Sequence, residues 1–284
     1  MVQGRYDELA AARTPLRAAG YEVPATEAAV FELLGWLHTD PMPTGELGRV
    51  IRREPGLTAS VLRAADDGVA PWTESLGHAV GLLGFDGLQQ LALSVPLLDA
   101  RERRHARMCQ LVLRSRRAAH VLTCLANECD WPEPELAYIA GLLLEFQTLQ
   151  QLWRASQAGW GWMEGQSGPE RLEAQELTRV WRLPPAVATA LVCWEKPDEA
   201  QEHQLLVRLA ALAAVSSGDP ILQQAAGSGG PLLRATELVK RYLPRLSLSR
   251  QMGLAEILTT ELRRCDGSGP GPAPEGSGNG RVHG

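Results

Sequence analysis

Residues 40–68 read DPMPTGELGRVIRREPGLTASVLRAADDG, and their pattern predicts two short helices. In the first helix, Thr44 has a side chain of the type preferred at helix N-caps, and the apolar residues that follow share one face, Leu47, Val50 and Ile51. The second helix begins near Thr58 and is expected to end at Gly68, because glycine commonly terminates helices. The stretch is therefore typical of a helical protein.

The same helical periodicity extends along most of the chain. Residues 25–37 have apolar side chains at three- and four-residue spacings, which predicts an amphipathic helix. Residues 73–98 predict two helices that meet at a hinge around Gly84, and residues 101–128 predict one long helix that ends before Pro132. Further helices are expected over residues 171–181, 183–194, 201–217, 231–243 and 247–264. Alternating runs of β-branched residues are almost absent, so the expected fold class is all-α.

Three segments are expected along the chain. Residues 1–100 form an N-terminal helical lobe, and residues 101–265 form a second helical lobe that includes the C-terminal helices. Residues 266–284 are rich in Gly, Pro and Ser and have almost nothing apolar to bury, which predicts a disordered tail.

The composition is that of a soluble globular protein, with 45% hydrophobic and 21% charged residues among 284. The net charge of −5 gives no reason to expect binding to nucleic acid or to an anionic membrane. No apolar run approaches the roughly 18 residues of a membrane-spanning helix, and the N-terminus lacks the apolar core of a secretory signal. The 5 cysteines include no CxxC pair, so reduced thiols and a cytoplasmic location are expected.

Two stretches, residues 40–68 and 75–97, together resemble the N-terminal half of an HDOD domain. That family has the pattern Ile-x-x-Asp-Pro-x-Leu, then a helix ending near Asn-Ser, then Ala-x-x-x-Leu-Gly. The corresponding residues here are Ile51, Glu54, Pro55 and Leu57, then Asp66 and Asp67, then Ala79, Leu83 and Gly84. The resemblance extends over roughly residues 22–215.

The resemblance implies an all-α fold similar to that of HD-type metal-dependent phosphohydrolases. It also implies a role in bacterial signalling without an established catalytic activity. In the second half of such domains a stretch like Ala-Gly-Leu-Leu-His-Asp-Ile-Gly is frequent, and residues 140–147, AGLLLEFQ, occupy that place. Leu144 stands where the histidine would be, Glu145 where the aspartate would be, and Gln147 where the glycine would be.

The other positions that correspond to metal ligands have changed as well. Arg114 and Ser115 match a His-Ser pair, while Trp194 and Glu195 match paired histidines. Metal-assisted hydrolysis needs several imidazole and carboxylate ligands around the ion, so we expect no metal, no cofactor and no catalytic activity. A weak cation site made only of carboxylates remains the alternative, with Glu145, Glu195 and Glu170 as its candidates.

A buried carboxylate at Glu145 is unfavourable unless another group pairs with it. Arg114 would supply a partner, in which case a salt bridge replaces the ion. If residues 101–120 instead form one continuous helix, four arginines fall within an arc of about 80°. These are Arg103, Arg107, Arg114 and Arg117. Such an arginine ridge suits an acidic protein partner, a phosphate or a nucleic-acid backbone, although a solvated helix face is the simpler interpretation.

Two of the 8 tryptophans, Trp160 and Trp162, fall in a Gly-rich connector. Tryptophans in loops are candidate anchors for a protein partner, and folding back onto the domain is the alternative. The sequence thus predicts a non-catalytic regulatory module that contacts an unidentified protein partner, with a second copy of itself as a further candidate. The alternative is a degenerate phosphohydrolase retained as a sensor of a nucleotide or another anion at Arg114. Nucleic acid is the least expected partner.

Overall fold

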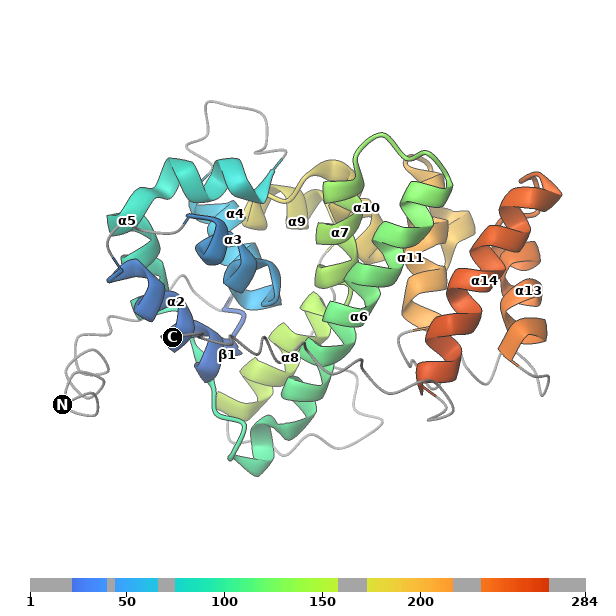
Figure 1. The fold of residues 1–284 in the computed structure, drawn as a ribbon. Helices are drawn as coiled ribbons and strands as arrows, with labels where there is room; N and C mark the ends of the chain where they lie inside the picture. The colour runs from blue at the N-terminus through green and yellow to red at the C-terminus, as the bar shows by residue number, and fades with distance from the viewer. Residues whose placement is uncertain (1–21, 40–43, 66–74, 158–172, 217–230, 266–284) are drawn as a thin grey trace, which may run out of the picture.

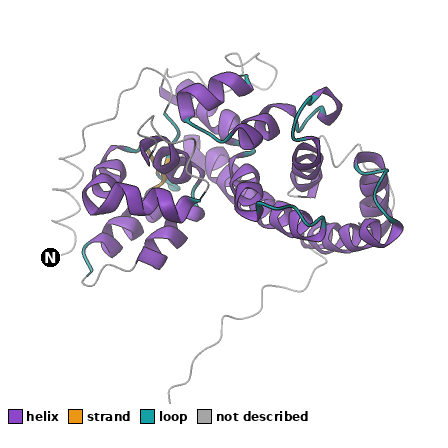
Figure 2. Ribbon diagram, turned by 90° about the horizontal axis from the view of Figure 1, so that it is seen from above, coloured by secondary structure: helices purple, strands orange, loops and turns teal. Residues whose placement is uncertain are grey.

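The computed structural model describes residues 22–39, 44–65, 75–157, 173–216 and 231–265. Figure 1 shows helices α2 to α5 on one side, α6 and α7 through the middle, and α13 and α14 on the far side. We call the first group, with its two short strands, the N-terminal lobe, and the helices from α6 onward the C-terminal lobe. Figure 2 shows how little of the described chain is strand.

The N-terminal lobe begins and ends at a short parallel strand pair. Strand β1 pairs with β2 so that Ala25 lies beside Leu97, and the Ala25 N–H donates to the Pro96 carbonyl at 2.9 Å. The elements of this lobe are β1 (Ala25–Thr26), α2 (Glu27–Leu37), α3 (Thr44–Arg52), α4 (Pro55–Ala65), α5 (Leu76–Ser94) and β2 (Leu97–Leu98). The helix predicted from residue 25 therefore starts two residues later, because those two residues extend to meet β2.

Helix α5 bends at the glycine-rich position that the sequence indicated as a hinge. Gly84 has φ 58° and ψ −167°, a conformation that side-chain-bearing residues rarely adopt. The helix is capped at its start by the Ser75 hydroxyl, which accepts a hydrogen bond from the His78 N–H at 3.0 Å. The predicted hinge is confirmed, and it redirects the second half of α5 across α4.

The C-terminal lobe is built around α6 and α7. Its elements are the 3₁₀ turn η1 (Arg103–His105), α6 (Ala106–Glu128), α7 (Pro134–Leu143), α8 (Phe146–Gln157), α9 (Ala174–Trp181), α10 (Pro185–Cys193), the 3₁₀ turn η2 (Pro197–Glu199), α11 (Gln204–Ser216), α13 (Pro231–Tyr242) and α14 (Leu248–Cys265). The predicted C-terminal helices are confirmed to within one or two residues at each end.

Helices α6 and α7 cross at very close range because α7 carries a glycine at the contact. A Cβ atom at Gly141 would lie 2.6 Å from Ala119 Cα and 2.7 Å from the Ala118 carbonyl oxygen, which is closer than van der Waals contact allows. The small side chains of the two alanines contribute to the same approach. Gly141 therefore sets the spacing of the two helices on which the candidate site lies.

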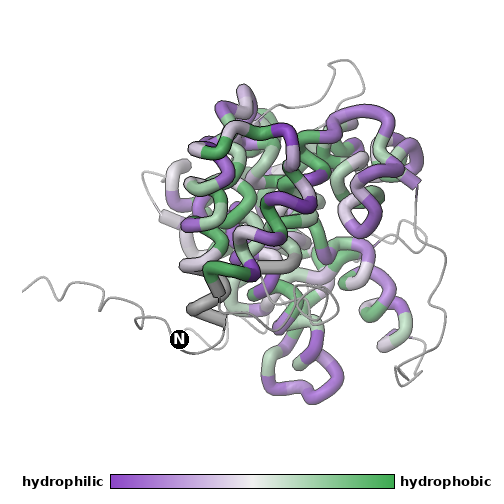
Figure 3. Tube along the Cα trace, turned by 90° about the vertical axis from the view of Figure 1, so that its right-hand side faces the viewer, coloured by the Kyte–Doolittle hydropathy of each residue, from purple (hydrophilic) through white to green (hydrophobic). Residues whose placement is uncertain are grey.

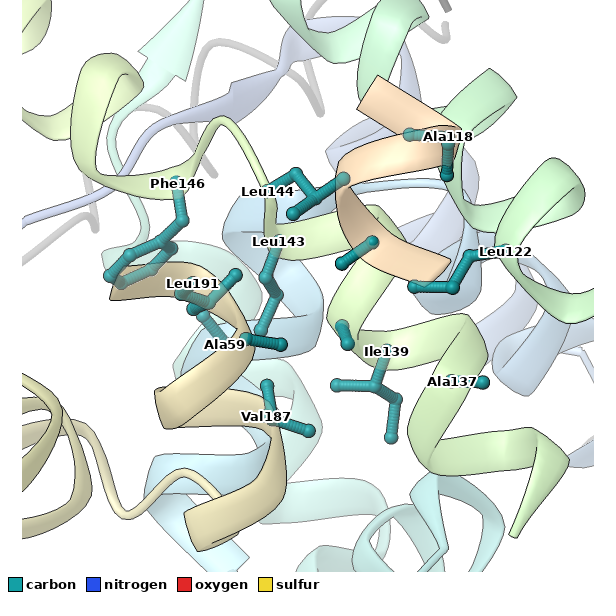
Figure 4. Close-up of a cluster of buried hydrophobic side chains, with 14 of the residues drawn as sticks. Ala59, Ala118, Leu122, Ala137, Ile139, Leu143, Leu144, Phe146, Val187 and Leu191 are labelled. Carbon is teal, nitrogen blue, oxygen red and sulfur yellow. The ribbon is translucent and has the colours of Figure 1, made fainter. Parts of the chain in front are cut away.

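The core is continuous from one lobe to the other. Figure 4 shows a part of it in which Ala59 of α4 lies among side chains of α6, α7 and α10. In Figure 3, hydrophobic segments concentrate where helices pack, and hydrophilic segments lie on outer helices. The all-α fold class is confirmed, with a single two-residue strand pair within the described ranges. The division near residue 100 into two folding units stays a prediction.

The start of the long helix also differs from the sequence prediction. The long helix expected from residue 101 begins at Ala106, and a 3₁₀ turn precedes it. Asp99 is the cause, because its carboxylate accepts hydrogen bonds from the Arg101 N–H at 2.8 Å and Nε–H at 2.9 Å. The Asp99 N–H in turn lies 3.1 Å from Nδ1 of buried His105. These local bonds hold the chain in a turn that an α-helix would break.

Within the described residues, no helix has the length and apolar character needed to cross a bilayer. The predicted tail at 266–284 and the connector with Trp160 and Trp162 lie outside the described residues.

Candidate functional site

The stretch AGLLLEFQ contains a break between two helices. Helix α7 ends at Leu143 and α8 begins at Phe146, so Leu144 and Glu145 occupy the corner. Glu145 Oε1 lies 3.0 Å from Arg114 Nη2, with the two side chains 14% and 23% exposed. The pairing of Arg114 with Glu145 considered from the sequence is thus present. The Arg114 guanidinium balances the charge of this carboxylate.

The residues around Glu145 are packed as a core. Leu144 is buried and belongs to the hydrophobic cluster of Figure 4. Phe146 is fully buried and meets the Trp181 ring edge-on, with ring centroids 4.7 Å apart. Gln147 is also buried. Apolar packing therefore occupies the corner where the sequence pattern of the resembled family would place a metal-binding dyad.

The second pair of changed positions lies just after α10. Trp194 is buried in the hydrophobic core, while Glu195 is exposed. Ser115, which follows Arg114, has no exposed surface. Among the described residues, no group of three or more His, Cys, Asp or Glu side chains is placed to hold a metal ion. Glu170, the third carboxylate of the all-carboxylate alternative, lies outside the described residues.

The arginine ridge required one continuous helix from residue 101, and that premise is wrong. Arg103 lies in the 3₁₀ turn before α6, and Arg114 faces Glu145. Arg107 and Arg117 remain on α6 with exposed side chains. Whether Arg103, Arg107 and Arg117 contact a partner stays a prediction, with Arg114 no longer part of the same surface.

Comparison with known proteins identifies the family of one part of the chain. A protein-family model described as HDOD domain matches residues 23–156. This part of the chain is an HDOD domain. No curated protein matches the chain.

Two solved structures have a fold similar to that of this chain. One is described as the MmoQ response regulator from Methylococcus capsulatus str. Bath, at 20% identity and TM-score 0.58, covering 84% of this chain and 99% of that one. The other, a 20–298 fragment of MmoQ from the same organism, gives 21% identity and TM-score 0.54, covering 81% and 94% of the two chains. At these identities the likeness establishes the fold alone.

The structure explains the Ile-x-x-Asp-Pro-x-Leu pattern by which the HDOD domain was recognised. Glu54, at the acidic position, has no exposed surface. Its carboxylate accepts hydrogen bonds from the Thr26 N–H at 3.2 Å and from the Thr26 hydroxyl at 2.8 Å, and it forms an ion pair with Arg116 of α6. Arg116 also donates to the Arg53 carbonyl at 2.5 Å. The motif acid therefore fastens the N-terminal lobe of the HDOD domain to α6.

A second polar connection joins the lobes beside the first. Glu135 Oε1 of α7 lies 2.7 Å from Arg52 Nη2 of α3. The same carboxylate accepts a hydrogen bond from the Leu76 N–H at 3.0 Å. The Tyr138 hydroxyl donates to the Arg52 carbonyl at 2.9 Å, and burial raises the pKa of Tyr138. No local sequence pattern marks these residues. The only signal available was the motif position of Glu54, which does not reveal its partner 62 residues away.

Proposed function

We propose that this HDOD protein is a non-catalytic bacterial signalling module that acts in the cytoplasm by contacting a protein partner. The observation that carries the proposal is the ion pair between Arg114 and Glu145. A positive guanidinium at this distance opposes the approach of a second cation, and Leu144 and Trp194, at two of the other ligand positions, offer no lone pairs to a metal. Without such an ion, this corner has no group placed to acidify a water molecule.

The signalling role is supported by the HDOD family match and by the description of MmoQ as a response regulator. An anion sensor built on Arg114 is less well supported, because any anion there would compete with Glu145 for the guanidinium.

Phosphoester hydrolysis is the direct test. The full chain is incubated with cyclic dinucleotides and with phosphomonoesters, each with Mn²⁺ or Mg²⁺, beside the Glu145→Ala variant. We expect no turnover above that of the buffer for either protein. Turnover by the wild-type chain that Glu145→Ala abolishes would contradict the proposal, because it would assign Glu145 a place in a working centre.

The contact with a partner needs a separate test. The exposed arginines Arg107 and Arg117 supply one candidate surface, and Trp160 and Trp162 supply the other. We expect a partner captured from the native host by the wild-type chain to be lost with Arg107→Glu/Arg117→Glu or with Trp160→Ala/Trp162→Ala. Arg179→Glu, an exposed arginine of α9, serves as the control that retains the partner. Equal recovery with all four proteins would remove both surfaces from the proposal.

A further inference from the structure

A cavity of about 400 Å³ lies where α4, the second half of α5 and the end of α9 meet. In Figure 1 these elements lie side by side at the junction of the two lobes, and α4 and α9 pack together. The bend at Gly84 opens this space, because it directs the second half of α5 over α4. The volume falls within the range of about 300–1,000 Å³ that is usual for small-molecule sites.

One wall of the cavity carries Arg63, a cation that forms no ion pair with a described carboxylate. Arg63 of α4 lies over the ring of Trp181, with its Cζ atom 5.1 Å from the ring centroid. This stacking fixes the plane of the guanidinium and leaves its N–H groups available. Among the described residues, no carboxylate forms an ion pair with Arg63, whereas arginines elsewhere in the N-terminal lobe, Arg49, Arg52 and Arg53, each pair with a glutamate.

The same wall contains an unused hydrogen-bond donor. Trp181 is only 2% exposed, and its Nε1 atom has no hydrogen-bond partner in the described part of the chain. Buried polar groups of folded proteins are nearly always hydrogen-bonded, so this indole N–H is left unsatisfied beside the cavity, although the nitrogen atom itself has no accessible surface. Arg63 is therefore the charged donor of the site, and the Trp181 ring is the surface on which it stacks.

The rest of the lining determines what else the ligand must carry. Val23, Leu91 and Val95 give the cavity buried apolar surface. Glu22 also lines it, and a carboxylate there favours a hydrogen-bond donor on the ligand and disfavours a second anionic group. The lining thus combines one place for an anion, one acceptor and an apolar surface between them.

We propose that this cavity binds a small organic anion, with a carboxylate or a phosphate at Arg63 and a flat apolar body against Val23, Leu91 and Val95. The ligand would lie between the lobes, since Arg63 belongs to α4 and Trp181, which also lines the cavity, belongs to α9. It would thereby favour one arrangement of the two lobes over others. That this ligand is the signal the module senses rests on the proposed function, whereas the binding itself does not.

Calorimetry on the full chain tests the proposal with matched pairs of probes. Naphthalene-1-carboxylate is compared with the neutral naphthalene-1-carboxamide, and adenosine monophosphate with adenosine. We expect saturable binding of at least one anion with one site per chain, at least about tenfold tighter than its neutral counterpart. The pair that binds distinguishes a carboxylate ligand from a phosphate ligand.

Variants then place the site. Arg63→Gln is expected to weaken binding of the anion at least about tenfold, and Trp181→Phe, which keeps a ring for Arg63 to stack on, to weaken it less. Arg179→Gln on the exposed side of α9 is the control and should leave the affinity unchanged. Ala64→Phe, at an exposed position of the lining, blocks the cavity without changing Arg63 and should abolish binding.

Three results would overturn the proposal: no saturable binding of any of the four probes, equal affinity for an anion and its neutral counterpart, or unchanged binding by both Arg63→Gln and Ala64→Phe. The phosphoester assay above has a different readout. Turnover in that assay would refute the non-catalytic role without affecting the proposed binding site. The absence of binding in calorimetry would refute the binding site without affecting the non-catalytic role.

Discussion

Two arginines of α6, Arg114 and Arg116, each pair with a glutamate, but in opposite surroundings. Arg114 meets Glu145 at the corner between α7 and α8, where both side chains keep some contact with solvent. Arg116 meets Glu54, which is fully enclosed and holds two further hydrogen bonds from Thr26. The Arg114–Glu145 pair thus lies at the corner between two helices, whereas the Arg116–Glu54 pair joins the two lobes.

The difference shows that an ion pair's importance follows from its burial and its additional bonds. A carboxylate with no access to water depends on every donor around it, and removal of its cationic partner leaves an unbalanced charge in the interior. A carboxylate with partial access to water can recover hydration when its partner is lost. The two pairs therefore make opposite predictions for substitutions of similar chemistry.

The largest effect is expected for Glu54→Ala. This change leaves the Thr26 N–H and hydroxyl without their acceptor and removes the carboxylate that pairs with Arg116, which is itself 34% exposed, so the free energy of unfolding should fall by about 2–4 kcal/mol. Urea denaturation followed by circular dichroism measures it. A loss below about 1 kcal/mol would mean that the junction is held by apolar packing alone.

A smaller loss is expected for Glu145→Ala. Its side chain is 14% exposed and Arg114 is 23% exposed, so solvent compensates part of the lost interaction. We expect the free energy of unfolding to fall by about 1–2 kcal/mol in the same urea titration. Equality with Glu54→Ala would break the contrast between the two pairs.

A smaller change still is expected when both members of the outer pair become apolar. Arg114→Met/Glu145→Leu removes two charges together and extends the apolar packing of Leu144 and Phe146, so stability should stay within about 1 kcal/mol of wild type, in either direction. The double variant compared with its two single variants gives the coupling energy. A double variant less stable than either single one would show that the pair is needed in its ionic form.

The smallest effect is expected for Glu195→Ala. Its side chain is exposed after α10, where charges are solvated, and the change should alter stability by no more than about 0.5 kcal/mol. Thermal unfolding measures this, with Glu145→Ala alongside. A loss as large as that of Glu145→Ala would place Glu195 in the interaction of Arg114 and Glu145.

The sequence was sufficient for the fold class, for most helices and for the bend at Gly84, because these follow from local periodicity and from the backbone freedom of glycine. It also offered Arg114 as a partner of Glu145, since both occupy recognisable positions of the resembled pattern.

The sequence did not predict the pairing of Glu54 with Arg116, because a contact between residues 62 apart leaves no local pattern. It missed the 3₁₀ turn before α6 for a similar reason, as the hydrogen bonds of Asp99 compete with a helix that propensity alone would extend. The cavity at Arg63 depends on the relative placement of three helices and was likewise invisible.

The pairing of Ala25 with Leu97 brings together the points at which the chain enters and leaves the N-terminal lobe. A unit whose two ends are neighbours has the geometry of an insert, which can be transplanted into a surface loop of a host protein through a short double junction. Exchange of this lobe between relatives would therefore require matching at three places: the strand pair itself, the acidic and basic side chains that α6 and α7 present to it, and the contacts of α4 with α7 and α9.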